Sequence, residues 1–146
     1  QIGVMHDEYL DSHEQGDYLI RNLVRVDVDR GAVVIADDIE VGQTVSFQLR
    51  DPAAASQDLQ RILALWGQAS GQARAAGALL FSCNGRGEAF FTTSDHDAVT
   101  VRDQLGGAEV AGYFAAGEIG PVAGRNHLHG FSASVVVFEG GSSRDD

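Results

Sequence analysis

Apolar residues in the first third of the chain come in short runs broken by polar turns, the pattern of a β-rich region. The run over 18–28 ends at Asp29-Arg30-Gly31, and a second apolar run over 32–35 follows. This arrangement predicts a β-hairpin over 18–35. A third strand is predicted over 44–49, where apolar and polar positions alternate and one face carries Val45, Phe47 and Leu49.

Two later stretches have the periodicity and end signals of helices. Asp51 is a good N-cap and Pro52 suits the first helical position, so a helix is predicted over 52–70. Its apolar stripe consists of Ala55, Leu59, Ile62, Leu63 and Trp66. A second helix is predicted over 95–105, capped by Ser94, with Asp97 as a capping-box carboxylate.

The remaining pattern completes an α+β fold. Strands are predicted over 77–83, 110–114 and 131–138, with a short extended piece at 88–93 and a polar loop at 124–130. Strands that arrive in runs with two intervening helices predict a two-layer domain, with two main helices on a mixed, largely antiparallel sheet. The predicted core comprises Val45, Phe47, Leu59, Leu63, Trp66, Leu79, Phe81, Val135 and Val137.

Length and charge narrow the classes of function. The 146 residues suit one domain, which we assign to 18–139. We expect a polar leading segment at 1–17 with one helical turn, and a frayed tail at 140–146. Because the chain does not begin with Met, we expect a fragment of a longer protein. A net charge of −11 disfavours nucleic acid and anionic membranes as partners. The lone Cys83 fits a reducing cytoplasm.

The stretch 76–87 is the most informative, because an apolar strand ends there in Cys83-Asn84-Gly85-Arg86-Gly87. Flanking glycines let the backbone take a positive φ or approach a ligand closely. A second glycine-rich turn carries Glu118. If the strands that follow the two helices are neighbours, Arg86 and Glu118 face each other across a pocket. Such a pocket offers a guanidinium to a carboxylate and a carboxylate to an ammonium, as a free amino acid requires. The alternative is that the two side chains simply pair with each other.

Other polar residues suggest weaker candidates. Arg21 and Asn22 could contribute to the ligand site, although Arg21 suits a solvated strand equally well. Cys83 could act as a nucleophile if His127 or His129 served as its base. The two histidines also resemble half a metal site, and either one could be an axial haem ligand.

Taken in order, several motifs resemble the FIST C-terminal domain family. They are Leu19-Ile20-Arg21-Asn22, Gly42-Gln43 with Arg50-Asp51, Cys83-Asn84-Gly85-Arg86-Gly87, Gly112 to Pro121 with its Gly-Glu-Ile-Gly-Pro end, and His127-Leu128-His129-Gly130. The resemblance implies a cytoplasmic sensory module that binds small ligands such as amino acids. It also implies a preceding FIST N-terminal domain and a signalling partner protein, and some members are described as haem-based nitric oxide sensors.

We therefore expect a non-catalytic ligand-binding domain of an intracellular signalling protein, with haem sensing and a Cys83-dependent enzyme as alternatives. The expected ligand-binding residues are Arg86, Glu118, Asn84, Cys83, Arg21 and Asn22.

Overall fold

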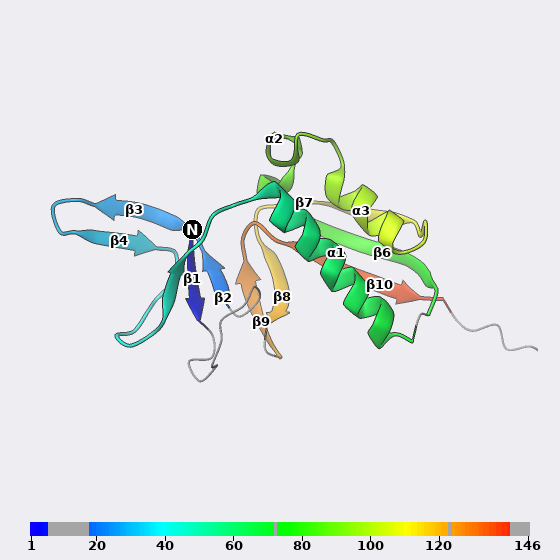
Figure 1. Cartoon of the computed structure of the whole chain (residues 1–146), viewed down its shortest axis with the longest axis horizontal. Coiled ribbons are helices and arrows are strands. Elements are labelled where there is room, and N and C mark those ends of the chain that lie inside the picture. The colour runs from blue at the N-terminus through cyan, green and yellow to red at the C-terminus, as the bar shows by residue number, and fades with distance from the viewer. Residues whose placement is uncertain (6–17, 72, 123, 141–146) are drawn as a thin grey trace, which may run out of the picture. The chain divides into compact units, whose positions relative to one another are not determined.

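The computed structural model describes residues 1–5, 18–71, 73–122 and 124–140 (Figure 1). These residues form an α+β fold, as predicted, and they divide into two compact units. Unit 1 comprises Gln1–Arg50 and Ile119–Gly130, and unit 2 comprises Asp51–Glu118 and Phe131–Asp146. Within the described residues, no helix combines the length and the apolar character needed to cross a bilayer.

Unit 1 contains a three-stranded antiparallel sheet with β1 (Ile2–Met5) at its centre. β2 (Tyr18–Arg21) and β5 (Val45–Phe47) flank this strand, and Ile2, Val4 and Met5 are buried. Residues 2–5, which were predicted to lie in a polar leading segment, are therefore a central strand. The polar residues that follow made so short an apolar segment inconspicuous. Residues 6–17, including His13, lie outside the described residues.

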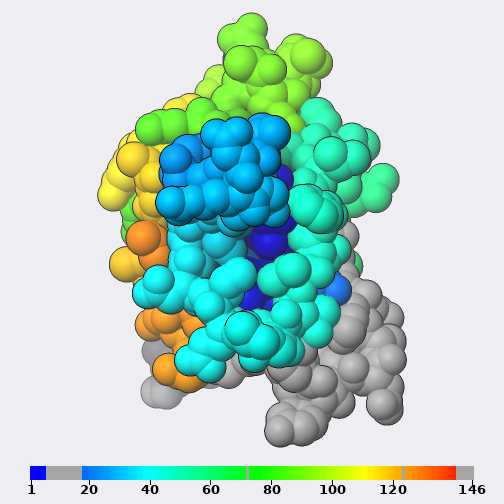
Figure 2. All heavy atoms as spheres, turned by 90° about the vertical axis from the view of Figure 1, so that its left-hand side faces the viewer, coloured from blue at the N-terminus to red at the C-terminus, as the bar shows by residue number. Residues whose placement is uncertain are grey.

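Two hairpins complete unit 1. β3 (Leu23–Asp27) pairs with β4 (Ala32–Ile35), which confirms the predicted hairpin, although the single strand expected over 18–28 is interrupted at Asn22. β8 (Glu118–Val122) pairs with β9 (Arg125–His129), so the prediction of a polar loop over 124–130 is wrong. Figure 2 shows the β3–β4 hairpin of unit 1 in blue, with dark blue β1 visible among the cyan segments of the same unit.

Unit 2 is a three-stranded sheet with two main helices on one face (Figure 1). β6 (Ala75–Cys83) lies between β10 (Ala133–Glu139), which is antiparallel to it, and β7 (Val110–Ala115), which is parallel. α1 (Pro52–Ala69) and α3 (His96–Gln104) confirm both predicted helices to within about a residue at most ends. The predicted cap is also confirmed, because the Ala54 amide donates to Asp51 Oδ2 at 2.8 Å.

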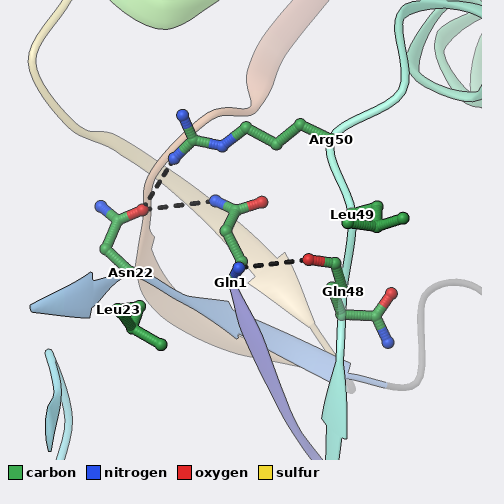
Figure 3. A pocket seen from close by; sticks show the side chains of 6 residues that line it. All are labelled: Gln1, Asn22, Leu23, Gln48, Leu49 and Arg50. Carbon is green, nitrogen blue, oxygen red and sulfur yellow. Dashed lines mark hydrogen bonds between the residues drawn. The ribbon is translucent and has the colours of Figure 1, made fainter. Parts of the chain in front are cut away.

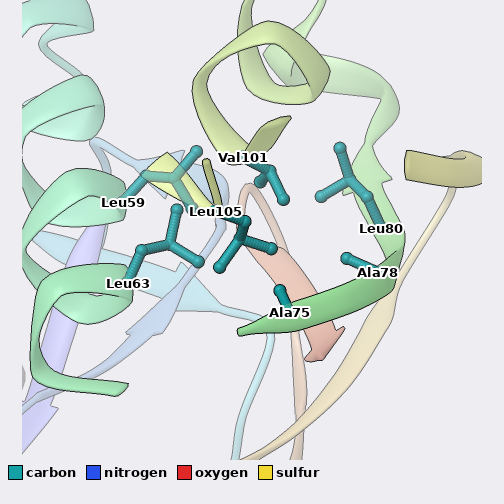
Figure 4. Packing of buried hydrophobic residues seen from close by; sticks show 7 residues of the cluster. All are labelled: Leu59, Leu63, Ala75, Ala78, Leu80, Val101 and Leu105. Atoms are coloured by element: carbon teal, nitrogen blue, oxygen red, sulfur yellow. The ribbon is translucent and has the colours of Figure 1, made fainter. Parts of the chain in front are cut away.

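The core of unit 2 lies between the sheet and these helices (Figure 4). It consists of Leu59, Leu63, Ala75, Ala78, Leu80, Val101 and Leu105. The predicted core residues Leu59 and Leu63 are confirmed, and Trp66, Val135 and Val137 pack against the cluster while partly exposed.

Four predicted core positions are not in this cluster. Leu79 and Phe81 are half-buried on the opposite face of β6, because the strand is apolar at both parities and its sequence does not say which face is covered. Val45 and Phe47 are 48% and 81% exposed, so their prediction as core residues is wrong. Both belong to β5, an edge strand with only β1 as its neighbour.

The chain turns into a helix where an extended piece was expected. A 3₁₀ turn, η1 (Asn84–Arg86), leads into α2 (Glu88–Phe91), and the Thr92 amide closes it by donating to Glu88 O at 2.8 Å. Gly85 does not take a positive φ. A Cβ at this position would lie 2.5 Å from Cε2 of Phe131. The absence of a side chain at Gly85 therefore lets the Phe131 ring pack closely against the backbone.

Candidate functional site

Polar residues gather at the edge of the unit 2 sheet where β6 and β7 end and β10 begins. Cys83, the last residue of β6, is paired with Ala115 at the end of β7, and the Cys83 amide donates to Ser132 O at 2.9 Å, beside the start of β10. The two polar motifs therefore do emerge at one edge of the sheet, as the neighbouring-strand hypothesis required. We call this cluster the polar end; it comprises Ser82, Cys83, Arg86, Asp97, Glu118 and Ser132.

Arg86 forms a buried bidentate ion pair with Asp97. Nε donates to Oδ2 at 2.7 Å and Nη2 donates to Oδ1 at 2.9 Å, and the side chains are only 6% and 4% exposed. Arg86 also stands over the Phe91 ring at 5.1 Å. The alternative that Arg86 pairs with Glu118 is thus wrong: the guanidinium binds the first turn of α3 instead.

Asp97 accepts further hydrogen bonds that complete its solvation. Ser82 Oγ donates to Oδ2 at 2.6 Å, and His96 Nδ1 lies 3.1 Å from Oδ1. Burial raises the pKa of Asp97, but hydrogen bonds from Arg86, Ser82 and His96, together with the Arg86 charge, outweigh burial and lower it. Asp97 is therefore not the predicted capping-box residue; α3 begins after Asp95, whose side chain makes no capping bond.

His96 extends the network to the first helix. Its Nε2 lies 3.1 Å from Ser56 Oγ on α1, and its ring stacks on Phe91 with centroids 3.7 Å apart. Sequence reasoning missed both His96 and Ser56. The adjacent His96-Asp97 pair was a visible signal, whereas nothing local to Ser56 indicates a partner forty residues away.

Glu118 is the most buried polar residue of the polar end, with 2% of its surface exposed. Its Oε2 accepts hydrogen bonds from Ser132 Oγ at 2.9 Å and from the Ser132 amide at 3.4 Å. Its Oε1 is buried and has no hydrogen-bond partner among the described residues. A buried acceptor without a partner costs free energy, so the arrangement is complete only if something else supplies a donor.

The other two predicted residues of this region differ in exposure. Asn84 is exposed on η1, and Cys83 is half-buried with a free thiol. The described contacts of Cys83 include no hydrogen bond from a histidine.

Arg21 and Asn22 lie in unit 1. Arg21 forms an ion pair with Asp37 and donates from Nη1 to Leu128 O at 3.1 Å. Asn22 lines a pocket of about 520 Å³ (Figure 3), and its Oδ1 accepts from Arg50 Nη2 at 2.9 Å and from Gln1 Nε2 at 3.3 Å. The other lining residues are Leu23, Gln48 and Leu49. This pocket is a second candidate site, and Arg21 is not among the residues that line it.

His127 and His129 share β9, with ring centroids 6.2 Å apart. His129 Nε2 lies 2.9 Å from Gly120 O, so its ring is already oriented by the backbone of β8. Within the described part of the chain, no three His, Cys, Asp or Glu side chains gather as a metal site would require.

Comparison with known sequences identifies the family. A family model described as "FIST C domain" matches residues 1–121. The chain belongs to the FIST C domain family. The resemblance seen in the motifs is thereby confirmed.

Curated relatives of this FIST C domain occur in mycobacteria. "Uncharacterized protein Mb0898c" of Mycobacterium bovis is 51% identical over 138 residues, which cover 94% of this chain and 36% of that protein. "Uncharacterized protein Rv0628c" of Mycobacterium tuberculosis is 53% identical over the same shares. The chain thus spans little more than a third of the length of these relatives. No solved structure matches it. Family membership indicates a sensory signal-transduction domain.

Proposed function

We propose that this FIST C domain binds a small metabolite with an ammonium group, an amino acid or a close analogue, and acts as the ligand-sensing part of a longer signalling protein. The proposal rests on one observation: Glu118 Oε1 is buried and has no hydrogen-bond partner among the described residues. The proposal includes a FIST N-terminal domain in the parent chain, a signalling partner protein and a cytoplasmic location.

An ammonium group suits Glu118 on physical grounds. It supplies three N–H donors and a positive charge, and a charge-assisted hydrogen bond is roughly twice as strong as a neutral one. Ser132 holds Oε2 through two hydrogen bonds, so the carboxyl group is already oriented before a ligand arrives. Binding would therefore supply the missing donor to a carboxyl group that Ser132 already holds in place.

The carboxylate of an amino-acid ligand would bind on the Arg86 side. Asp97 uses Nε and Nη2 of Arg86, which leaves Nη1 outside the ion pair. Asn84 is exposed on the same turn and can donate from its side-chain amide. Cys83 lies between this turn and the sheet and contributes shape to the site.

The proposal also holds that the domain is not an enzyme. His96 contacts Asp97 through one ring nitrogen and Ser56 through the other, as in a serine-hydrolase triad. These two contacts are the observation that favours a competing hydrolase function. A hydrolase also needs backbone donors for an oxyanion. The amides of Ala54 and Ala55, next to Ser56, already donate to Asp51. We therefore assign the Ser56–His96–Asp97 contacts to joining α1 and α3.

The two functions separate in one set of assays on the full parent chain. A thermal-shift screen compares amino acids with analogues that lack the amino group and with amines that lack the carboxyl group. We expect amino acids to raise the melting temperature most and the deaminated acids to have no effect. An equal shift with a deaminated acid contradicts the proposal, and ester hydrolysis that Ser56→Ala abolishes supports the hydrolase instead.

A further inference from the structure

The sheet of unit 2 has a second face that the two main helices do not cover. The strand registers place Leu79 beside Val136 on one side and beside Ala111 on the other, and Phe81 beside Tyr113. The Phe81 and Tyr113 rings meet edge to face with centroids 5.2 Å apart, which places them on the same face. We call this surface the free face; its positions are Gly77, Leu79, Phe81, Cys83, Ala111, Tyr113, Ala115, Ser134, Val136 and Phe138.

The free face is apolar and exposed. Tyr113 is 66% exposed, Phe138 51% and Val136 47%, while Leu79 and Phe81 are half-buried between their neighbours. None of the ten positions carries a charged side chain, although the chain as a whole has a net charge of −11. Contiguous apolar patches of this kind are uncommon on free protein surfaces and mark sites of interaction.

The topology gives a second reason to expect a cover. β10 is antiparallel to β6, but β6 and β7 form a parallel pair, the pairing that is typical of sheets covered on both faces. Their strands accordingly have apolar residues at both parities, as β6 has in Ala75–Cys83 and β10 in Ala133–Glu139. An amphipathic helical layer is the usual cover for such a face.

We propose that the free face is covered in the parent protein by a segment of the same polypeptide that lies outside these 146 residues. Nearly two thirds of the length of the mycobacterial relatives lies outside the matched region, which is ample chain for another layer. A second copy is the less suitable occupant, because each copy brings a net charge of −11 and the two would repel. This inference does not depend on the proposed ligand.

The test measures whether thiols on the free face are accessible in the full parent chain. Val136→Cys and Leu65→Cys are made separately in a Cys83→Ser background; Val136 lies on the free face, Leu65 lies on α1, and both are 47% exposed. Alkylation rates are measured by mass spectrometry of the peptide that carries each residue, in native protein and in urea. Tyr113→Cys repeats the measurement if Val136→Cys does not fold.

In the native parent chain, we expect the thiol at position 136 to react at least about tenfold more slowly than in urea, at a rate that does not change on dilution. The thiol at position 65 reports how the reagent reaches a half-exposed side chain. Reaction at position 136 as fast in native protein as in urea overturns the inference. Protection that disappears on dilution also overturns it, because that result assigns the cover to a second copy.

Discussion

Replacing Arg86 with alanine should destabilise unit 2 severely. Asp97 is 4% exposed and accepts four hydrogen bonds, two of them from Arg86. Removing one partner of a buried ion pair leaves the other charge uncompensated and costs about 3–5 kcal/mol. Domains of this size are stable by about 5–15 kcal/mol, so Arg86→Ala removes a large part of the total. In urea unfolding, this corresponds to a midpoint lowered by about 2 M.

The matched control is the exposed ion pair between Arg61 and Asp58 on α1, whose N–O distance of 2.8 Å is similar but whose side chains are 50% and 38% exposed. Arg61→Ala should cost less than about 1 kcal/mol, because solvent screens an exposed pair. The double variant Arg86→Met with Asp97→Leu should recover much of the loss, since it removes both buried charges. If Arg86→Ala costs no more than Arg61→Ala, the buried pair does not stabilise the fold. Arg86→Ala is therefore a poor test of ligand binding, because a lost response would reflect the lost fold.

Three further predictions concern pH, backbone packing and haem. The pKa of Asp97 in the folded protein is below its ordinary value of 3.8. The stability that its carboxylate contributes is therefore complete above pH 3.8 and is lost as the pH falls through the folded pKa. Acid unfolding of Asp97→Asn should lack this pH-dependent loss of stability. Gly112→Ala should disrupt the β6–β7 pairing, because a Cβ would lie 1.7 Å from Leu80 O. Gly67→Ala has open space around it in α1 and should raise stability by about 0.5–1 kcal/mol. Equal melting temperatures for the two variants would refute this prediction. Added hemin should give no Soret band that His127→Ala or His129→Ala abolishes, because His129 already contacts Gly120 O, and such a band would contradict us.

The sequence predicted those features that local chemistry determines. Asp51 and Pro52 marked the start of α1, and the polar turn at 29–31 marked the β3–β4 hairpin. The convergence of the Arg86 and Glu118 motifs followed from one assumption about neighbouring strands, which the parallel pairing of β6 and β7 confirms.

Features that depend on distant partners could not be predicted in this way. Asp97 has the position of a capping residue, and only the fold brings Arg86 and Ser82 to it. β9 is polar enough to resemble a loop, and it is a strand because β8 pairs with it. Leu79 and Leu80 are equally apolar, so the choice of the covered face depends on where α1 and α3 pack.

The central claim is that Glu118 binds the ammonium group of the ligand, and titration calorimetry of the best amino acid from the screen tests it most directly. Glu118→Gln preserves shape and an acceptor for Ser132, and it should keep or raise the melting temperature because it removes a buried acidic group. Binding should weaken by about 2–5 kcal/mol, at least thirtyfold. Arg50→Ala, in the pocket of unit 1, should leave the affinity unchanged. Unaltered affinity in Glu118→Gln, with the loss appearing in Arg50→Ala, would contradict the account and assign the ligand to the pocket of unit 1.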